Sequence, residues 1–183
     1  MQIQDISSLL ARSLGCELSH IRDIHIVQSL WSGYGAIVRF MHNETLLIAK
    51  LVNTQAMPQH PKGWSGQTSH ERKLSSFINE QTFYQAHASS LKHIAKTPMW
   101  LATKNTDEAM VMVLQDVDAV GYDQRYYQLN DTRFTQCLHW LARFHAYFLV
   151  YARDPTLWPR GNYWHLDTRQ DEFAMMAEGE LKQ

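Results

Sequence analysis

Residues 45–52 read TLLIAKLV, and this stretch places a lysine inside an apolar strand pattern. Side chains of a strand alternate between two faces, so Ile48 and Lys50 share one face while Leu47 and Leu51 lie on the other. An unpaired ammonium group among apolar neighbours is costly to bury. Lys50 is therefore expected either to meet an opposite charge or to extend its ammonium group to water.

The candidate ion-pair partner for Lys50 is Glu80. It lies in the segment SHERKLSSFINEQTFYQAHASS (69–90), whose pattern predicts a helix. Counting three positions to either side of Glu80 reaches Phe77 and Phe83, so the carboxylate shares a face with aromatic side chains. Buried opposite charges hold each other ionised, and removing one strands the other at a typical loss of ~3–5 kcal/mol. We expect an internal ion pair between Lys50 and Glu80. The alternative places Glu80 at the rim of the helix face.

The sequence on either side of these two residues predicts a sheet. Turn residues and apolar alternation predict five strands with one helix inserted, the first three strands forming an antiparallel meander. The fold class is therefore α+β. The predicted elements are a helix at 3–14, strands at 22–31, 35–42 and 45–52, a loop at 53–68, a helix that begins after Ser69, strands at 97–103 and 109–115, a connector at 116–130 and a helix that opens at Asp131 or Thr132.

The last of these helices carries apolar residues at helical spacing. Its predicted inner stripe contains Phe134, Leu138, Leu141, His145 and Phe148. A histidine on such a face is more often a satisfied core residue than a catalytic one, so we interpret His145 as core. This helix is expected to begin a second, helical lobe.

Charge and hydropathy argue against a nucleic-acid-binding, a membrane or a secreted protein. Seventeen basic and eighteen acidic residues give a net charge of −1, which provides no field for nucleic acid or an acidic membrane. The amino-terminal residues lack the pattern of a signal peptide, and the most apolar stretch, 137–152, is interrupted by charged and histidine residues. We expect a cytoplasmic protein that binds neither nucleic acid nor membrane.

Metal chemistry also finds no support in the sequence. The two cysteines, Cys16 and Cys137, are far apart and form no C-x-x-C pair, so neither a disulfide framework nor a zinc site is expected. None of the ten histidines shows ligand spacing supported by cysteine or carboxylate partners. The sequence predicts no metal ligands.

Four segments carry a resemblance to a known family. The order of a glycine-bearing hairpin, a strand lysine, a helix glutamate and two further strands resembles the small lobe of the protein-kinase-like fold. More specifically, the chain resembles the small-molecule kinases that include ecdysteroid-kinase-like proteins and, more distantly, aminoglycoside phosphotransferases and choline kinases. The segments are HPKGWSGQTSHERKLSSFINEQTFYQ (60–85), MVLQDVDAVGY (112–122), CLHWLARFHAYFL (137–149) and LWPRGNYWHLDTRQDEFAMM (157–176).

The resemblance implies a site for ATP. Lys50 matches the strand lysine that contacts the nucleotide's phosphates, and Glu80 matches the helix glutamate that orients it. Gly33 and Gly35 occupy the position of the glycine-rich cover over the phosphates, although glycine serves plain hairpins equally well. The backbone of residues 115–117, from Gln115 to Val117, would bind adenine.

Other polar groups in these segments are interpreted as structural. Asp116 and Asp118 follow a strand end, where acids are usually solvated, so we do not assign them to a metal. The family's His-Gly-Asp-x-x-x-x-Asn loop and later metal-binding Asp do not occur. His165 and Asp167 imitate that loop, but Glu172 stands where Asn is required, so we interpret them as a decoy. We therefore predict no catalytic residue, and Mg²⁺ only with a missing carboxy-terminal portion.

The sequence thus predicts an amino-terminal portion of a kinase-like protein. Residues 1–115 would form the small lobe, 116–130 the hinge, and 131–183 the incomplete start of a helical lobe. The family consists of enzymes that move phosphate from ATP to a small-molecule hydroxyl, whereas this chain alone is predicted to be inactive. The alternative is a non-catalytic interaction module whose partner is a second copy or the missing half, with an aromatic tail formed by Trp158, Tyr163 and Trp164.

Overall fold

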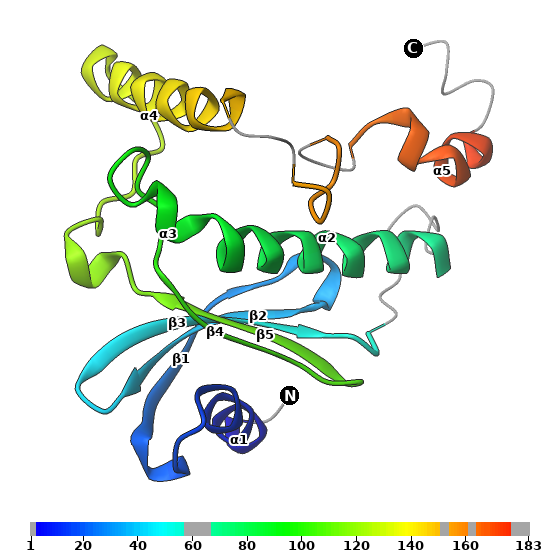
Figure 1. Cartoon of the computed structure of the whole chain (residues 1–183). Coiled ribbons are helices and arrows are strands. Elements are labelled where there is room, and N and C mark those ends of the chain that lie inside the picture. Colours follow the sequence, from blue (N-terminus) through cyan, green and yellow to red (C-terminus); the bar gives the residue numbers. More distant parts are fainter. Residues whose placement is uncertain (1–2, 57–66, 151–153, 161–163, 177–183) are drawn as a thin grey trace.

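The computed structural model describes residues 3–56, 67–150, 154–160 and 164–176. Its centre is one five-stranded antiparallel sheet with the strand order β1-β2-β3-β5-β4, so the predicted α+β class and meander are confirmed. Helix α1 covers one face of the sheet and α2 crosses the other, while α4 lies beyond α2 (Figure 1). The arrangement is consistent with a kinase-like small lobe followed by helices. The strands are β1 (Ile21–Ser29), β2 (Gly35–His42), β3 (Thr45–Asn53), β4 (Trp100–Asn105) and β5 (Ala109–Gln115), and the helices are α1 (Ile3–Leu14), α2 (Gln67–Ala86), α3 (Ala88–Leu91), α4 (Asp131–Leu149) and α5 (Gln170–Met175).

The main core lies between the sheet and α1. The strand positions that face α1 alternate with those that face α2, and only the α1 side forms a large buried cluster. Leu47, Ala49 and Leu51 of β3 belong to this cluster, which leaves Lys50 on the α2 side. A smaller cluster of Tyr34, Val52 and Met110 lies on that second side. The thinner packing there makes room for polar groups between the sheet and α2.

Several element boundaries differ from the predicted ones. β1 ends at Ser29 because residues Trp31–Gly33 form a 3₁₀ turn. Helix α2 begins at Gln67 rather than after Ser69. Ser69 is therefore a residue of the first helical turn, and it is buried. β4 begins at Trp100, three residues later than predicted. Residues 57–66 of the predicted loop lie outside the described residues.

The packing face of α4 is not the predicted one. Asn130 caps the helix by accepting a hydrogen bond from the Arg133 amide at 3.0 Å. Phe144 and Phe148 pack on Phe83 of α2, with ring centroids 5.9 and 6.3 Å away.

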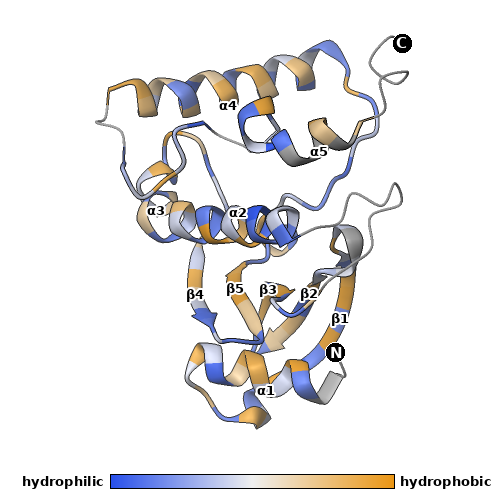
Figure 2. Cartoon of the chain, turned by 90° about the vertical axis from the view of Figure 1, so that its right-hand side faces the viewer, coloured by the Kyte–Doolittle hydropathy of each residue, from blue (hydrophilic) through white to orange (hydrophobic). Residues whose placement is uncertain are grey.

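The predicted inner stripe of α4 is therefore wrong for most of its members. Phe134, Leu138 and Leu141 are 53%, 47% and 42% exposed, and His145 is exposed, so it is not a core histidine. Apolar residues recur along α4 beyond the side that faces α2 (Figure 2). Periodicity identified an apolar helix, but the contact with α2 selected which side is covered. Within the described residues, none of the helices combines the length and apolarity needed to cross a bilayer.

Candidate functional site

The lysine at the centre of the sheet meets the glutamate of the long helix. Lys50 Nζ donates a hydrogen bond to Glu80 Oε2, and it also lies 4.7 Å from the centroid of the Phe77 ring. The side chains of Lys50 and Glu80 are 19% and 37% exposed, so the pair is closer to solvent than the apolar sequence pattern suggested. The expected pairing is present, and the Glu80 side chain, 37% exposed, lies towards the rim of the helix face. The ammonium group is thus oriented by one carboxylate and remains partly accessible.

The glycine turn between β1 and β2 is built around a buried tyrosine. Tyr34 is 2% exposed, and its hydroxyl lies 2.9 Å from His70 Nδ1 on α2. Gly35 has a φ of 151°, and a Cβ placed there would collide with the carbonyl oxygen of Leu51. Gly33 has a φ of 72° and faces open space. Gly35 therefore has a structural role in bringing β2 close to β3, independent of any ligand.

Cationic side chains of α2 lie beside this turn. Lys73 Nζ is 4.9 Å from the centroid of the Tyr34 ring. Burial lowers the pKa of Lys73, and the positive charges of Arg72 and Arg169 lower it further. Arg72 Nη1 also donates to the Thr168 carbonyl oxygen at 2.6 Å, which ties α2 to the segment before α5. This cationic group was missed in the sequence, where the only signal was the run HERK at 70–73.

The connector after β5 is held by an arginine on β2. Asp116 is 2% exposed, and its Oδ2 accepts a hydrogen bond from Arg39 Nε at 2.6 Å. Asp118 accepts from Arg39 and from Arg125, each at 2.5 Å. These hydrogen bonds, that of Arg125 first and that of Arg39 second, lower the pKa of Asp118. The expectation of solvated acids is wrong for Asp116, which is buried, and both carboxylates serve ion pairs.

The backbone of this connector has a defined hydrogen-bond pattern. Gln115 N–H donates to the Met99 carbonyl at 2.8 Å, and the Val117 carbonyl accepts from the amides of Val120 and Tyr122 at 3.2 and 3.0 Å. Within the part of the chain that the structure describes, the Val117 N–H has no acceptor. The Val117 N–H is therefore, among the described residues, an unpaired donor close to the end of β5.

A cavity of about 560 Å³ adjoins the ion pair on the side of α4. Glu80 lines it, and the Trp158 amide donates to Asn79 of α2 at 2.8 Å. The predicted aromatic tail is represented here by Trp158 and Trp164, while Tyr163 lies outside the described residues. Half of the residues that line the cavity are aromatic, namely Phe83, Phe144, Phe148, Trp158 and Trp164, and Arg160 adds a positive charge.

The segment that resembles a catalytic loop pairs a half-buried histidine with an exposed carboxylate. His165 Nδ1 lies 3.7 Å from Asp167 Oδ2, and Asp167 is 73% exposed. The same carboxylate oxygen accepts from Arg160 at 3.2 Å. These contacts give Asp167 ion-pair partners within the chain.

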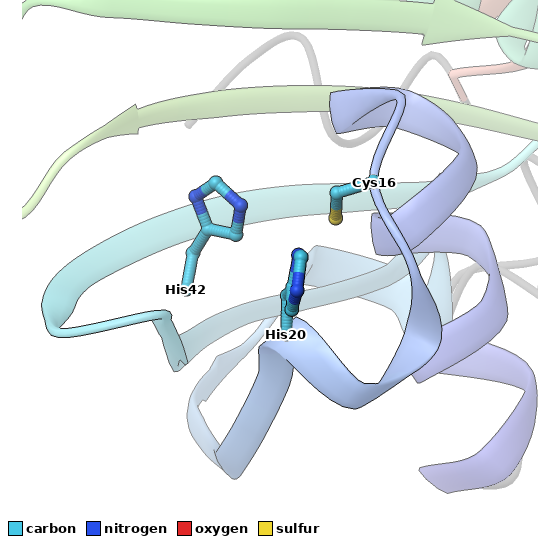
Figure 3. Close-up of side chains that lie close together, drawn as sticks. All are labelled: Cys16, His20 and His42. Atoms are coloured by element: carbon cyan, nitrogen blue, oxygen red, sulfur yellow. The ribbon is translucent and has the colours of Figure 1, made fainter.

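One group of potential ligands was not expected from the sequence. Cys16, His20 and His42 each offer a ligand atom, and these atoms lie within 4.8 Å of one another (Figure 3). The expectation that the histidines lack a cysteine partner is therefore wrong. The signal in the sequence was weak, because only Cys16 and His20 are close along the chain.

Comparisons with known proteins place the chain in no family. No family model matches it, and the search of curated proteins gives no match. One solved structure is similar, the crystal structure of a protein described as "Putative fructosamine-3-kinase" from Haemophilus somnus 129PT, with 13% identity and a TM-score of 0.39. The match covers 76% of this chain and 38% of that protein, so it spans well under half of the longer chain.

Proposed function

We propose that this chain is the nucleotide-binding portion of a kinase-like phosphotransferase, which moves the terminal phosphate of ATP to a hydroxyl of a small molecule. The observation that supports it most is the ion pair between Lys50 on the central strand and Glu80 on α2. A lysine held by a carboxylate and partly open to solvent is suited to contact phosphate oxygens.

Each part of the nucleotide would have a place on the chain. The phosphates would lie at Lys50 and below the turn of Gly33 and Gly35, where the nearby charge of Lys73 adds attraction. Adenine would bind the backbone of residues 115–117, with the Val117 N–H as its donor and the Gln115 carbonyl as its acceptor. The two parts are linked because Gln115 pairs with Leu47 on the same strand that carries Lys50.

The three carboxylates near the proposed nucleotide site, those of Glu80, Asp116 and Asp118, do not fit a magnesium site. Mg²⁺ is held by oxygen ligands, usually one or two carboxylates together with phosphate. Glu80 is engaged by Lys50, while Asp116 and Asp118 are engaged by arginines. We therefore propose no step through a metal on these residues, and we expect the chain alone to bind ATP without turning it over.

Calorimetry with ATP tests the proposal. A charge-assisted hydrogen bond is worth about 1.5–3 kcal/mol, so Lys50→Ala is expected to weaken ATP binding by about 10- to 150-fold. Lys104→Ala is the matched control, because Lys104 is an exposed lysine on the edge strand β4. Failure of the unmodified chain to bind ATP, or equal affinity in Lys50→Ala, would refute the nucleotide site.

A second candidate function is a non-catalytic interaction module. The uncovered side of α4 supports it, since Phe134, Leu138 and Leu141 are all more than two-fifths exposed. Size-exclusion chromatography separates the two candidates. A dimer that is indifferent to ATP favours the interaction module, whereas a monomer that binds ATP favours the phosphotransferase.

A further inference from the structure

The side of the sheet that faces α1 carries a separate cluster of one cysteine and two histidines. Val38, Phe40 and His42 alternate along β2, and the first two belong to the core under α1. His42 therefore projects on the α1 side, opposite to Lys50. Cys16 and His20 approach it from the segment that joins α1 to β1 (Figure 3).

Backbone hydrogen bonds fix the place of all three residues. Helix α1 ends at Leu14, and the next residue, Gly15, has a φ of 66°. The Cys16 N–H donates to the Ala11 carbonyl at 3.0 Å, which is the long bond of a Schellman cap. His20 closes a 3₁₀ turn by donating its N–H to the Glu17 carbonyl at 3.1 Å.

The same segment is joined to the turn that carries the second histidine. Asn43 N–H donates to the His20 carbonyl at 3.0 Å, and Ile21 pairs with His42 in the sheet. The end of α1 and the β2–β3 turn are therefore held beside each other before any ligand binds.

We propose that Cys16, His20 and His42 bind a zinc ion, with the fourth position open to water or to an external ligand. A thiolate and two imidazoles are ligands that Zn²⁺ prefers, whereas Mg²⁺ and Ca²⁺ require oxygen ligands. The two imidazole rings are not stacked, since their centroids are 6.4 Å apart and their planes are inclined by 54°. The rings are therefore not held face to face, and one ligand atom of each lies within 4.8 Å of the other and of the cysteine sulfur.

The distances require only a small closure. Bond lengths of about 2.3 Å to sulfur and 2.0–2.1 Å to nitrogen place tetrahedral ligand atoms about 3.3–3.6 Å apart. The three atoms lie within 4.8 Å of one another, so movements of about 1 Å bring them to that spacing. His20 is exposed and can rotate, while Cys16 and His42 are half-buried, and Cys16 packs against the core under α1. The ion would join the end of α1 to the β2–β3 turn.

Metal titration of the full chain tests this site. Elemental analysis after addition of zinc and dialysis is expected to give one ion per chain, and Co²⁺ is expected to give tetrahedral visible absorption with a thiolate-to-cobalt charge-transfer band. Changing an outer-sphere partner of a ligand typically costs about 10- to 100-fold in metal affinity, so removing the Cys16 ligand itself in Cys16→Ser is expected to cost about 100-fold or more. Cys137→Ser and His25→Gln are matched controls that should bind as the unmodified chain does, because neither residue belongs to the cluster.

A thiol-protection measurement keeps the test decisive if Cys16→Ser does not fold. In Cys137→Ser the remaining thiol is that of Cys16, and saturating zinc is expected to slow its alkylation at least tenfold. Absence of zinc and cobalt binding by the unmodified chain, or unchanged alkylation with zinc, would overturn the proposal. The result is independent of ATP binding, because the cluster lies on the opposite face of the sheet from Lys50.

Discussion

Removing the ion pair between Lys50 and Glu80 should lower the free energy of unfolding. The size of the loss should depend on how exposed the two side chains are. Lys50→Met removes the ammonium group but keeps an unbranched apolar stem, and Glu80→Gln removes the carboxylate charge at constant size. Exposed ion pairs contribute about 0–1 kcal/mol, while breaking a buried pair costs about 3–5 kcal/mol. With side chains 19% and 37% exposed, Lys50 and Glu80 lie between these limits. We expect a coupling free energy of about 1–2 kcal/mol.

A double-mutant cycle measures this coupling directly. Urea unfolding of the unmodified chain, both single variants and the double variant gives four free energies of unfolding, whose difference isolates the pair. The matched control is the pair Arg22–Glu44, which joins β1 to the turn between β2 and β3 at 3.2 Å, with side chains 54% and 93% exposed. Its coupling is expected to be close to zero because solvent screens it.

Two outcomes would contradict the reasoning. A Lys50–Glu80 coupling equal to that of Arg22–Glu44 would show that the internal pair is held no better than a surface pair. A coupling that does not fall with added salt would contradict its partial exposure. The first outcome would also weaken the proposed nucleotide site, which depends on a fixed lysine.

Three further perturbations have expected outcomes. Arg39→Met leaves the carboxylate of Asp116, which is 2% exposed, without its arginine, and should lower the free energy of unfolding in urea by about 2–3 kcal/mol. Asp116→Asn should cost less, because it removes the buried charge itself. The reverse order would refute the assignment of Arg39 as the partner that compensates this charge. Gly35→Ala forces a Cβ into the backbone of the neighbouring strand and should lower the thermal midpoint by an amount equivalent to about 3 kcal/mol, against about 1 kcal/mol for Gly33→Ala, which faces open space. The pKa of Asp118 is depressed in the folded state, so its contribution to stability is present above the unfolded value near 3.8 and is lost as pH falls through the folded pKa. In Asp118→Asn the free energy of unfolding should therefore fall less steeply as the pH decreases below the unfolded value. An unchanged dependence on pH would show that this carboxylate does not contribute.

Local sequence signals determined most of the sheet. The predicted bounds 3–14, 35–42 and 109–115 agree with α1, β2 and β5, because apolar periodicity and turn residues act over a few neighbouring positions. The apolar surroundings of Lys50 and the aromatic face of Glu80 predicted that these two charges meet only when they were combined with the order of the strands and helices.

Only the tertiary structure decided which groups from distant segments share a site. Asp116 is buried because Arg39, on another strand, reaches it, and α4 packs through Phe144 rather than Leu138 because Phe83 of α2 lies on that side. The cluster of Cys16, His20 and His42 likewise forms where a helix end meets a strand end. Helical and strand periods specify the faces of an element, but the partner that covers each face is set by long-range packing, which no local pattern contains.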